Sequence, residues 1–194
     1  MLADLIPAFA TRSKERRGHT LDNIETVLRK VDSPPGSDGL AAFEVFSGYL
    51  VLDALVANQD RHEENWAVVR PLPDEGRLTL AGSYDHGSSL GFNLTDSRRQ
   101  ILLERGDVPV FAAKARAHRF ERASDGQLTL VELAHEALRR CSGRARARWR
   151  ASLAGVSDDH MAAVVRQIPG LSDPARTFAA VLLRTNRGRL LCER

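Results

Sequence analysis

Apolar residues recur at helical spacing through the first part of the chain. Between Leu21 and Val31 they fall every three or four positions, and Thr20 and Asp22 are both placed to cap the helix that this predicts. The pattern stops at residues 33–39, a Pro- and Gly-rich stretch that cannot continue a helix. We therefore expect a short helix followed by a loop.

The next stretch, residues 40–57, is apolar almost all round, which predicts a buried central helix. Two short runs typical of β-strands follow at 66–69 and 77–82. They are joined by PLPDEG (71–76), which holds the Pro, Asp and Gly of a turn. The sequence predicts that the two runs pair as an antiparallel hairpin.

From about residue 95 onward the pattern is helical throughout. Capping residues such as Thr95, Thr129, Ser157 and Ser172 mark several of the helix starts. The expected helices are 96–104, 109–119, 129–141, 143–153, 157–167 and 173–185.

These elements predict one mainly α domain with a small β part (α+β), covering residues 1–194. Three segments make it up: an N-terminal helical segment 1–38, the central helix, loop and hairpin 39–95, and a helical subdomain 96–194. No internal repeat or low-complexity tract divides the chain further.

The composition is that of an average globular protein, with 43% hydrophobic and 27% charged residues among 194. This excludes a disordered chain, a collagen and a disulfide scaffold. No apolar run reaches the roughly 18 residues of a membrane span, and the N-terminal stretch has its apolar part before its charges, the reverse of a signal peptide. We therefore expect a soluble, cytoplasmic protein.

The net charge of +3 conceals an uneven distribution. Residues 1–97 carry nine basic and 15 acidic side chains, whereas residues 98–150 carry 13 basic and six acidic ones. A basic half can face an acidic partner or nucleic acid. Because too few aromatic residues lie among these arginines to form a platform that stacks on bases, we do not expect direct nucleic-acid binding.

Polar residues concentrate in two loops at the same end of the predicted hairpin. The first, NQDRHEEN, follows the central helix at 58–65, and the second, SYDHGSSLG, follows the second strand run at 83–91. Antiparallel pairing brings the loops together, so Asp60, Asn65 and Asp85 can converge on one site. A carboxylate that accepts a hydroxyl proton, with an amide and a second carboxylate that hold Mg²⁺, is the set that phosphoryl transfer requires.

The spacing Asp-x-x-x-x-Asn, then two strands and Asp-x-Gly, is an arrangement used by the kinase fold. The segments NQDRHEENWAVV and AGSYDHGSSLG resemble the C-terminal lobe of HipA-like kinases, and also the catalytic core of phosphatidylinositol 3/4-kinases. The resemblance is sharp over residues 50–91 and only architectural over 92–194.

The resemblance implies a kinase-like C-terminal lobe that uses ATP and Mg²⁺ and acts on Ser or Thr of a protein, with a possible relation to toxin–antitoxin systems. It implies Asp60 as the catalytic base and Asn65 and Asp85 as magnesium ligands. His62 would organise the loop or donate to a phosphate, and Asn58 and Gly87 would belong to the nucleotide site.

The sequence departs from the kinase pattern before Asp60. The 59 residues that precede it contain no G-x-G-x-x-G loop and no strand with a nucleotide-binding lysine, and Lys30 lies in a predicted helix. We therefore expect the N-lobe to be absent. The N-lobe could be a separate, antitoxin-like polypeptide. Alternatively, the chain could be a truncation, or a lone lobe that no longer catalyses.

A missing N-lobe would leave apolar surface exposed near residues 1–40 and Trp66, where a partner or a second copy would bind. Other functions stay open as well: a lipid or small-molecule kinase, a non-catalytic pseudokinase, or a hydrolase with a metal cage built from Asp60, His62, Asp85 and His86. Arg61 is either a positioning residue or an ordinary surface arginine.

Overall fold

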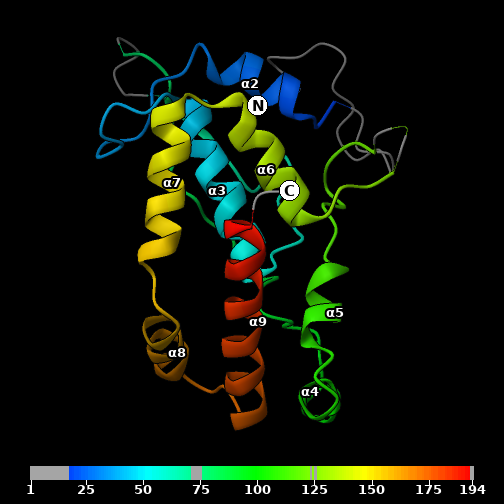
Figure 1. The fold of residues 1–194 in the computed structure, drawn as a ribbon. Helices are drawn as coiled ribbons and strands as arrows, with labels where there is room; N and C mark the ends of the chain where they lie inside the picture. The colour runs from blue at the N-terminus through cyan, green and yellow to red at the C-terminus, as the bar shows by residue number, and fades with distance from the viewer. Residues whose placement is uncertain (1–17, 71–75, 123, 125, 193–194) are drawn as a thin grey trace.

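The computed structural model describes residues 18–70, 76–122, 124 and 126–192. In chain order its elements are α2 (Leu21–Leu28), α3 (Ala42–Val56), β1 (Val68–Val69), β2 (Thr79–Leu80), α4 (Asp96–Glu104), α5 (Val108–Ala113), α6 (Leu130–Arg140), α7 (Gly143–Gly155), α8 (Asp158–Gln167) and α9 (Asp173–Leu191). The predicted class is confirmed: the chain is mainly helical with one small antiparallel sheet (Figure 1).

Helix α3 forms the centre of the larger core. It contacts α2, α6, α7 and α9, and Figure 1 shows it between α6 and α7 in the upper half of the molecule. Side chains around its whole circumference are buried, among them Phe43, Phe46, Leu50 and Ala54. This explains why the stretch is apolar all round, and it fixes where the loop after α3 begins.

Helix α9 organises the lower half of the molecule by packing on two sides. Phe178 and Leu182 join a core with α4 and α5, while Ala179 and Leu183 pack against Met161 of α8. Figure 1 accordingly shows α8 on one side of α9 and α4 and α5 on the other. The helix extends to Leu191, beyond the predicted end at residue 185.

The hairpin has the predicted antiparallel pairing, with Val68 opposite Leu80 and Val69 opposite Thr79. The strands are shorter than the expected runs, and most of the predicted turn at 71–76 lies outside the described residues. Asp32 extends the pairing, because its amide donates to the carbonyl of residue 78 at 2.7 Å and its carbonyl accepts from Leu80 at 2.9 Å. The hairpin is thus held beside the segment that follows α2.

The predicted helix 109–119 is wrong beyond Ala113, where α5 ends. The following residues run alongside the segment before α6: the Ala117 amide donates to the Leu128 carbonyl at 2.9 Å, and the Leu130 amide donates to the Ala115 carbonyl at 3.0 Å. These bonds satisfy the backbone without a helix. The extended conformation carries residues 114–119 past the polar loop that follows α3.

The expected apolar surface near residues 1–40 and Trp66 is not found in the part of that region that is described. Trp66 is only 2% exposed and packs edge-to-face on Phe46, with ring centroids 5.2 Å apart. From residue 18 onward, the apolar side chains of α2 are buried against the core. The apolar pattern of this region therefore belongs to the core, and residues 1–17 lie outside the description.

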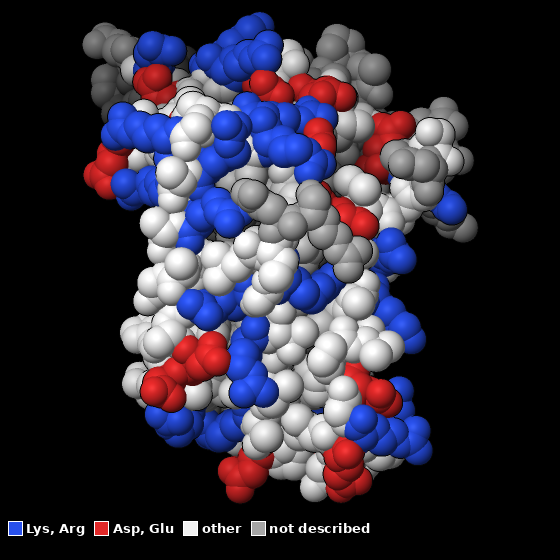
Figure 2. All heavy atoms as spheres, viewed as in Figure 1, with Lys and Arg blue, Asp and Glu red and all other residues white. Residues whose placement is uncertain are grey.

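Charged side chains cover much of the surface. Figure 2 shows Lys and Arg side chains gathered over the upper half of one face. Arginines of α6 and α7 donate to groups of the chain itself, as Arg140 does to Glu136 at 3.0 Å and Arg148 to Asp38 at 2.7 Å. No helix in the described ranges combines the length and the apolar character needed to cross a membrane.

Gly48 lets α3 and α7 approach closely, which yields a first prediction. A Cβ at residue 48 would lie 2.3 Å from an indole carbon of Trp149, whose Nε1 donates to the Glu44 carbonyl at 2.8 Å. Because the hydrogen bond restrains the ring, Gly48→Ala should lower the free energy of unfolding by about 1–3 kcal/mol in urea denaturation.

The matched control for this substitution is Gly188→Ala in α9, where an added Cβ meets no atom of the described chain within 4 Å. It should be neutral or stabilise the protein by up to roughly 1 kcal/mol, because alanine is the better helix former. Equal effects of the two substitutions would contradict the close packing of α3 on α7.

Candidate functional site

The polar loop starts where α3 ends in a left-handed residue, Ala57, with a φ of 56°. Asn58 then has no exposed surface. Its Nδ2 donates to Asp53 Oδ1 at 2.8 Å, and its Oδ1 accepts from the Asp60 amide at 3.2 Å. Asn58 therefore stabilises the start of the loop, and its place in a nucleotide site stays a prediction.

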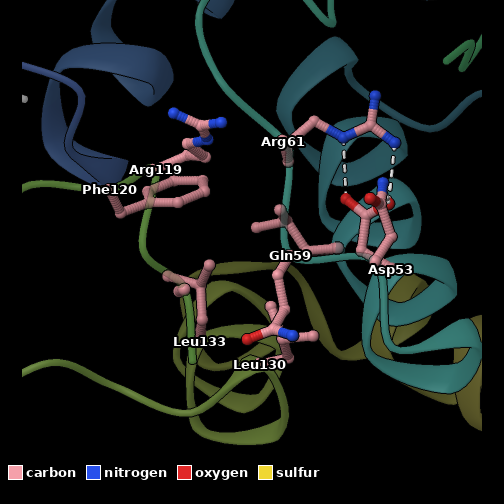
Figure 3. A pocket seen from close by; sticks show the side chains of 10 residues that line it. Asp53, Gln59, Arg61, Arg119, Phe120, Leu130 and Leu133 are labelled. Atoms are coloured by element: carbon pink, nitrogen blue, oxygen red, sulfur yellow. Dashed lines mark hydrogen bonds and ion pairs between the residues drawn. The ribbon is translucent and has the colours of Figure 1, made fainter. Parts of the chain in front are cut away.

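Asp53 and Arg61 form a buried ion pair beneath this loop. The Arg61 Nε and Nη2 atoms donate to the two carboxylate oxygens of Asp53 at 2.7 and 2.8 Å, and both side chains are 2% exposed. Figure 3 shows this two-pronged contact beside a small cavity behind the loop. The surface alternative for Arg61 is thus wrong.

The surroundings of Asp53 favour its charged form. Burial alone would raise the pKa of Asp53, but the nearby His86 ring, the hydrogen bonds from Arg61 and Asn58 and the Arg61 charge together outweigh burial and lower this pKa. Of these three neighbours of Asp53, His86 is the most distant, with its Nδ1 3.6 Å from Asp53 Oδ1.

Arg61 also joins the two polar loops. Its Nη1 donates to the carbonyls of Asn65 and Tyr84, the latter at 3.3 Å, and its Nη2 donates to Ser83 Oγ at 3.0 Å. A second hydrogen bond between the loops is the one that the Tyr84 hydroxyl donates to the Glu64 carbonyl at 2.8 Å. The structure therefore brings the loops after α3 and after β2 together, as the hairpin predicted.

Within the first loop, Asn65 and Asp60 are also linked. Asn65 Nδ2 donates to the Asp60 carbonyl at 2.7 Å, which leaves its Oδ1 as the atom able to accept or to bind a cation, although the residue is only 3% exposed. His62 Nδ1 accepts from the Glu64 amide at 3.2 Å, so His62 organises the turn.

In the second loop, the Asp85 side chain lies at the surface and makes no hydrogen bond or ion pair within the described chain. Its backbone is left-handed, with a φ of 55°, which is strained for a residue other than glycine. Gly87 is exposed, and the nearest atom to an added Cβ would be Asp85 Oδ1 at 3.8 Å. His86 instead turns inward and bonds to Ser83 Oγ at 3.0 Å through Nε2.

Asp60 has a partner that sequence reasoning did not find. Arg119 Nε donates to Asp60 Oδ1 at 2.6 Å, and the two side chains are 38% and 28% exposed respectively. Figure 3 shows Arg119 on the strand-like segment across from Gln59 and Arg61. No local pattern announces this contact, since 59 residues separate the partners. Asp53, by contrast, carried a signal: a carboxylate inside an apolar helix must be paired.

Of the three residues expected to form the catalytic set, only Asp60 lines the large cavity near the loop. Asp60 lines a cavity of about 530 Å³ together with residues of the 88–93 segment and of α5 and its continuation. Asn65 and Asp85 do not line this cavity. Whether the Asp60 carboxylate, Asn65 and Asp85 converge on one ion stays a prediction.

The described residues contain no cluster of three or more His, Cys, Asp or Glu side chains that could hold a metal ion. The cage expected for a metal-dependent hydrolase is therefore not found in the part of the chain that contains all four of its proposed ligands. His86 in particular faces Asp53 and Ser83 rather than Asp60. This removes the observation on which the hydrolase alternative rested.

Comparison with known proteins supports the fold. No protein-family model matches the chain, and no curated protein matches it significantly. Among solved structures it is similar to the crystal structure of a Helicobacter pylori proinflammatory kinase, CtkA, with a TM-score of 0.66 and 16% identity over 94% of this chain. The match covers 63% of the CtkA chain, so this chain spans less than two thirds of that structure's length. The chain thus has a kinase-like fold.

Breaking the buried pair should destabilise the protein strongly. Arg61→Met would leave Asp53 buried without its cation, which is expected to cost about 3–5 kcal/mol of unfolding free energy in urea denaturation. The matched control is Arg29→Met, because Arg29 is 71% exposed and pairs with Glu25 one helical turn away. That change should cost under about 0.5 kcal/mol. Similar losses in both variants would contradict a special role for Arg61.

Proposed function

We propose that this chain is the C-terminal, catalytic part of an ATP- and Mg²⁺-dependent kinase of the HipA-like type, which phosphorylates Ser or Thr side chains of a protein. The supporting observation is that Arg61 fastens loop 58–65 to residues 83–84. Phosphoryl transfer depends on holding a proton acceptor and metal ligands from separate segments in fixed positions. In this proposal, an N-lobe from elsewhere, such as an antitoxin-like polypeptide, covers the phosphates.

The donor atoms offered by the two loops suit magnesium. Asn65 Oδ1 and the Asp85 carboxylate are hard oxygen ligands, and Mg²⁺ takes few of these from a protein and keeps several waters. Magnesium bound there would neutralise charge on the nucleotide phosphates. The strained backbone of Asp85 supports a functional role, because such conformations persist mainly where the surroundings impose them at functional sites.

Asp60 acts in this proposal as the general base. Its carboxylate accepts the proton of the acceptor hydroxyl, while Asn65 holds the Asp60 backbone through the 2.7 Å hydrogen bond. Asn58 and His62 stabilise the loop on either side of it. Since Arg119 occupies Oδ1 of Asp60 in this structure, the base must be released from that ion pair before it can act.

The same ion pair favours a second candidate function, a non-catalytic lobe that binds a partner. With Arg119 Nε bound to Asp60 Oδ1 at 2.6 Å, that oxygen is not free to receive a hydroxyl proton as long as the pair persists. The two candidates differ in whether Mg²⁺ and ATP bind and whether phosphate is transferred.

The test compares Mg–ATP binding and phosphate transfer in two variants. Asp85→Asn should weaken binding of Mg–ATP to the chain at least about tenfold in titration calorimetry, because it removes a charged metal ligand. Asp60→Asn should leave that affinity unchanged. In the complex with its N-lobe, Asp60→Asn should reduce radiolabelled phosphate transfer by roughly 10²–10⁴, the usual contribution of a general base.

The control is Asp159→Asn, an exposed carboxylate in the first turn of α8, which should change neither measurement. Failure of the wild-type chain to bind Mg–ATP with or without an N-lobe would overturn the kinase proposal in favour of the non-catalytic lobe. Unchanged transfer by Asp60→Asn would remove Asp60 from the mechanism.

A further inference from the structure

The cavity of about 530 Å³ next to Asp60 has the size of a ligand site. Its walls come from three parts of the chain: the loop after α3, the segment before α4, and α5 with the extended residues after it. The lining includes Gln59 and Asp60 from the first part, Phe92 and Asn93 from the second, and Lys114 and Arg119 from the third. Asp60 lines this cavity and Asn65 and Asp85 do not, so it offers room for an acceptor next to the proposed base.

The charge of the cavity is set by one short segment. Lys114, His118 and Arg119 all line it, and they face a single carboxylate, Asp60. Lys114 is exposed, and its ammonium group has no carboxylate partner among residues 18–70, 76–122 and 126–192. Even with Arg119 paired to Asp60, a cation therefore remains to attract an anionic group.

The cavity also offers apolar and amide groups. Phe92 is 62% exposed at the cavity, an unusual position for a large aromatic ring, and Phe111 also lines the cavity. Asn93 adds an amide with donor and acceptor atoms, as a polypeptide backbone requires, and Gln59 adds the donor Nε2, since its Oε1 accepts from the Arg116 amide at 3.1 Å. Cations, an aromatic surface and amides together fit a polypeptide with an acidic and an apolar side chain better than a purely anionic headgroup, which would leave the aromatic ring and the amides without partners.

We propose, on the basis of the kinase function above, that this cavity binds the acceptor segment of a protein substrate in which the Ser or Thr is flanked by an acidic and an apolar side chain. The acidic side chain pairs with Lys114 and Arg119 and draws Arg119 away from Asp60. Asp60 Oδ1 then takes the hydroxyl proton, as the hydroxyl oxygen bonds to the γ-phosphorus of ATP and the bond to the bridging oxygen of ADP breaks. The acceptor thus releases the base that acts on it.

The experiment measures binding of fluorescein-labelled peptides to the chain without nucleotide, by anisotropy. A Ser peptide with Glu and Leu neighbours should bind at least roughly tenfold more tightly than the same peptide with Lys in place of Glu. Lys114→Glu should remove most of that preference. Lys30→Glu makes the same charge change at an exposed lysine just after α2 that does not line the cavity, and it should leave binding unchanged.

A double-mutant cycle tests the release of Arg119. Asp60→Asn should tighten binding of the acidic peptide several-fold, because Arg119 becomes available to it, and this gain should vanish in an Arg119→Gln background. Circular dichroism establishes that each variant is folded. An equal gain in both backgrounds would show that Asp60 acts only as a repelling charge and would overturn the release step.

Other outcomes overturn the binding site itself. These are equal binding of acidic and basic peptides, equal losses in Lys114→Glu and Lys30→Glu, or Lys114-dependent binding to phosphoinositide vesicles without peptide binding. Failure of this inference is distinguishable from failure of the kinase proposal, because the peptide assay contains no ATP. Peptide binding without Mg–ATP binding would leave the site standing and remove the kinase.

Discussion

Burying a carboxylate and a guanidinium together costs free energy that only good geometry and further hydrogen bonds can return. Asp53 and Arg61 meet both conditions, because the guanidinium forks onto the carboxylate and its remaining N–H groups reach the backbone of Asn65 and Tyr84. Asn58 satisfies Asp53 from the other side. The positions of both polar loops therefore depend on one ion pair at the end of α3.

This dependence links the core to the site. The apolar surroundings of α3 exclude water from Asp53, so the carboxylate must find its partners within the protein. Those partners are the residues that start and shape loop 58–65. The extended segment after α5 then adds Arg119 to Asp60 from outside the loop, so the proposed base is held between a buried scaffold and an exposed cation.

The sequence was sufficient to predict the parts that rest on local patterns. The apolar circumference of residues 40–57 predicted the central helix, and the alternating runs on either side of PLPDEG predicted the hairpin that brings the loops together. Long-range pairing was not predictable in the same way. Residues 115–117 have helical spacing but pair with 128–130, because the tertiary structure supplies those backbone partners.

The positions of individual side chains were harder to predict from the sequence than the helices and strands that carry them. Trp66 is buried, although the expected absence of an N-lobe predicted exposed apolar surface near it, because its ring packs on Phe46 of the central helix. The burial of Arg61 and the pairing of Asp60 with Arg119 could not be read from spacing, since both depend on where distant segments meet in space. The roles of Asp60, Asn65 and Asp85 in catalysis stay predictions.

The most direct test of the claim that one guanidinium positions both loops is hydrogen exchange in an Arg61→Lys variant. Lysine keeps the charge but cannot fork onto Asp53 while it also reaches the second loop. Mass spectrometry should show that amide protection falls together in residues 58–66 and 81–90, while α7, which donates its side-chain hydrogen bonds to other segments such as Asp38 and Glu44, keeps its protection. Loss of protection in only one of the two loops, or in neither, would contradict the account.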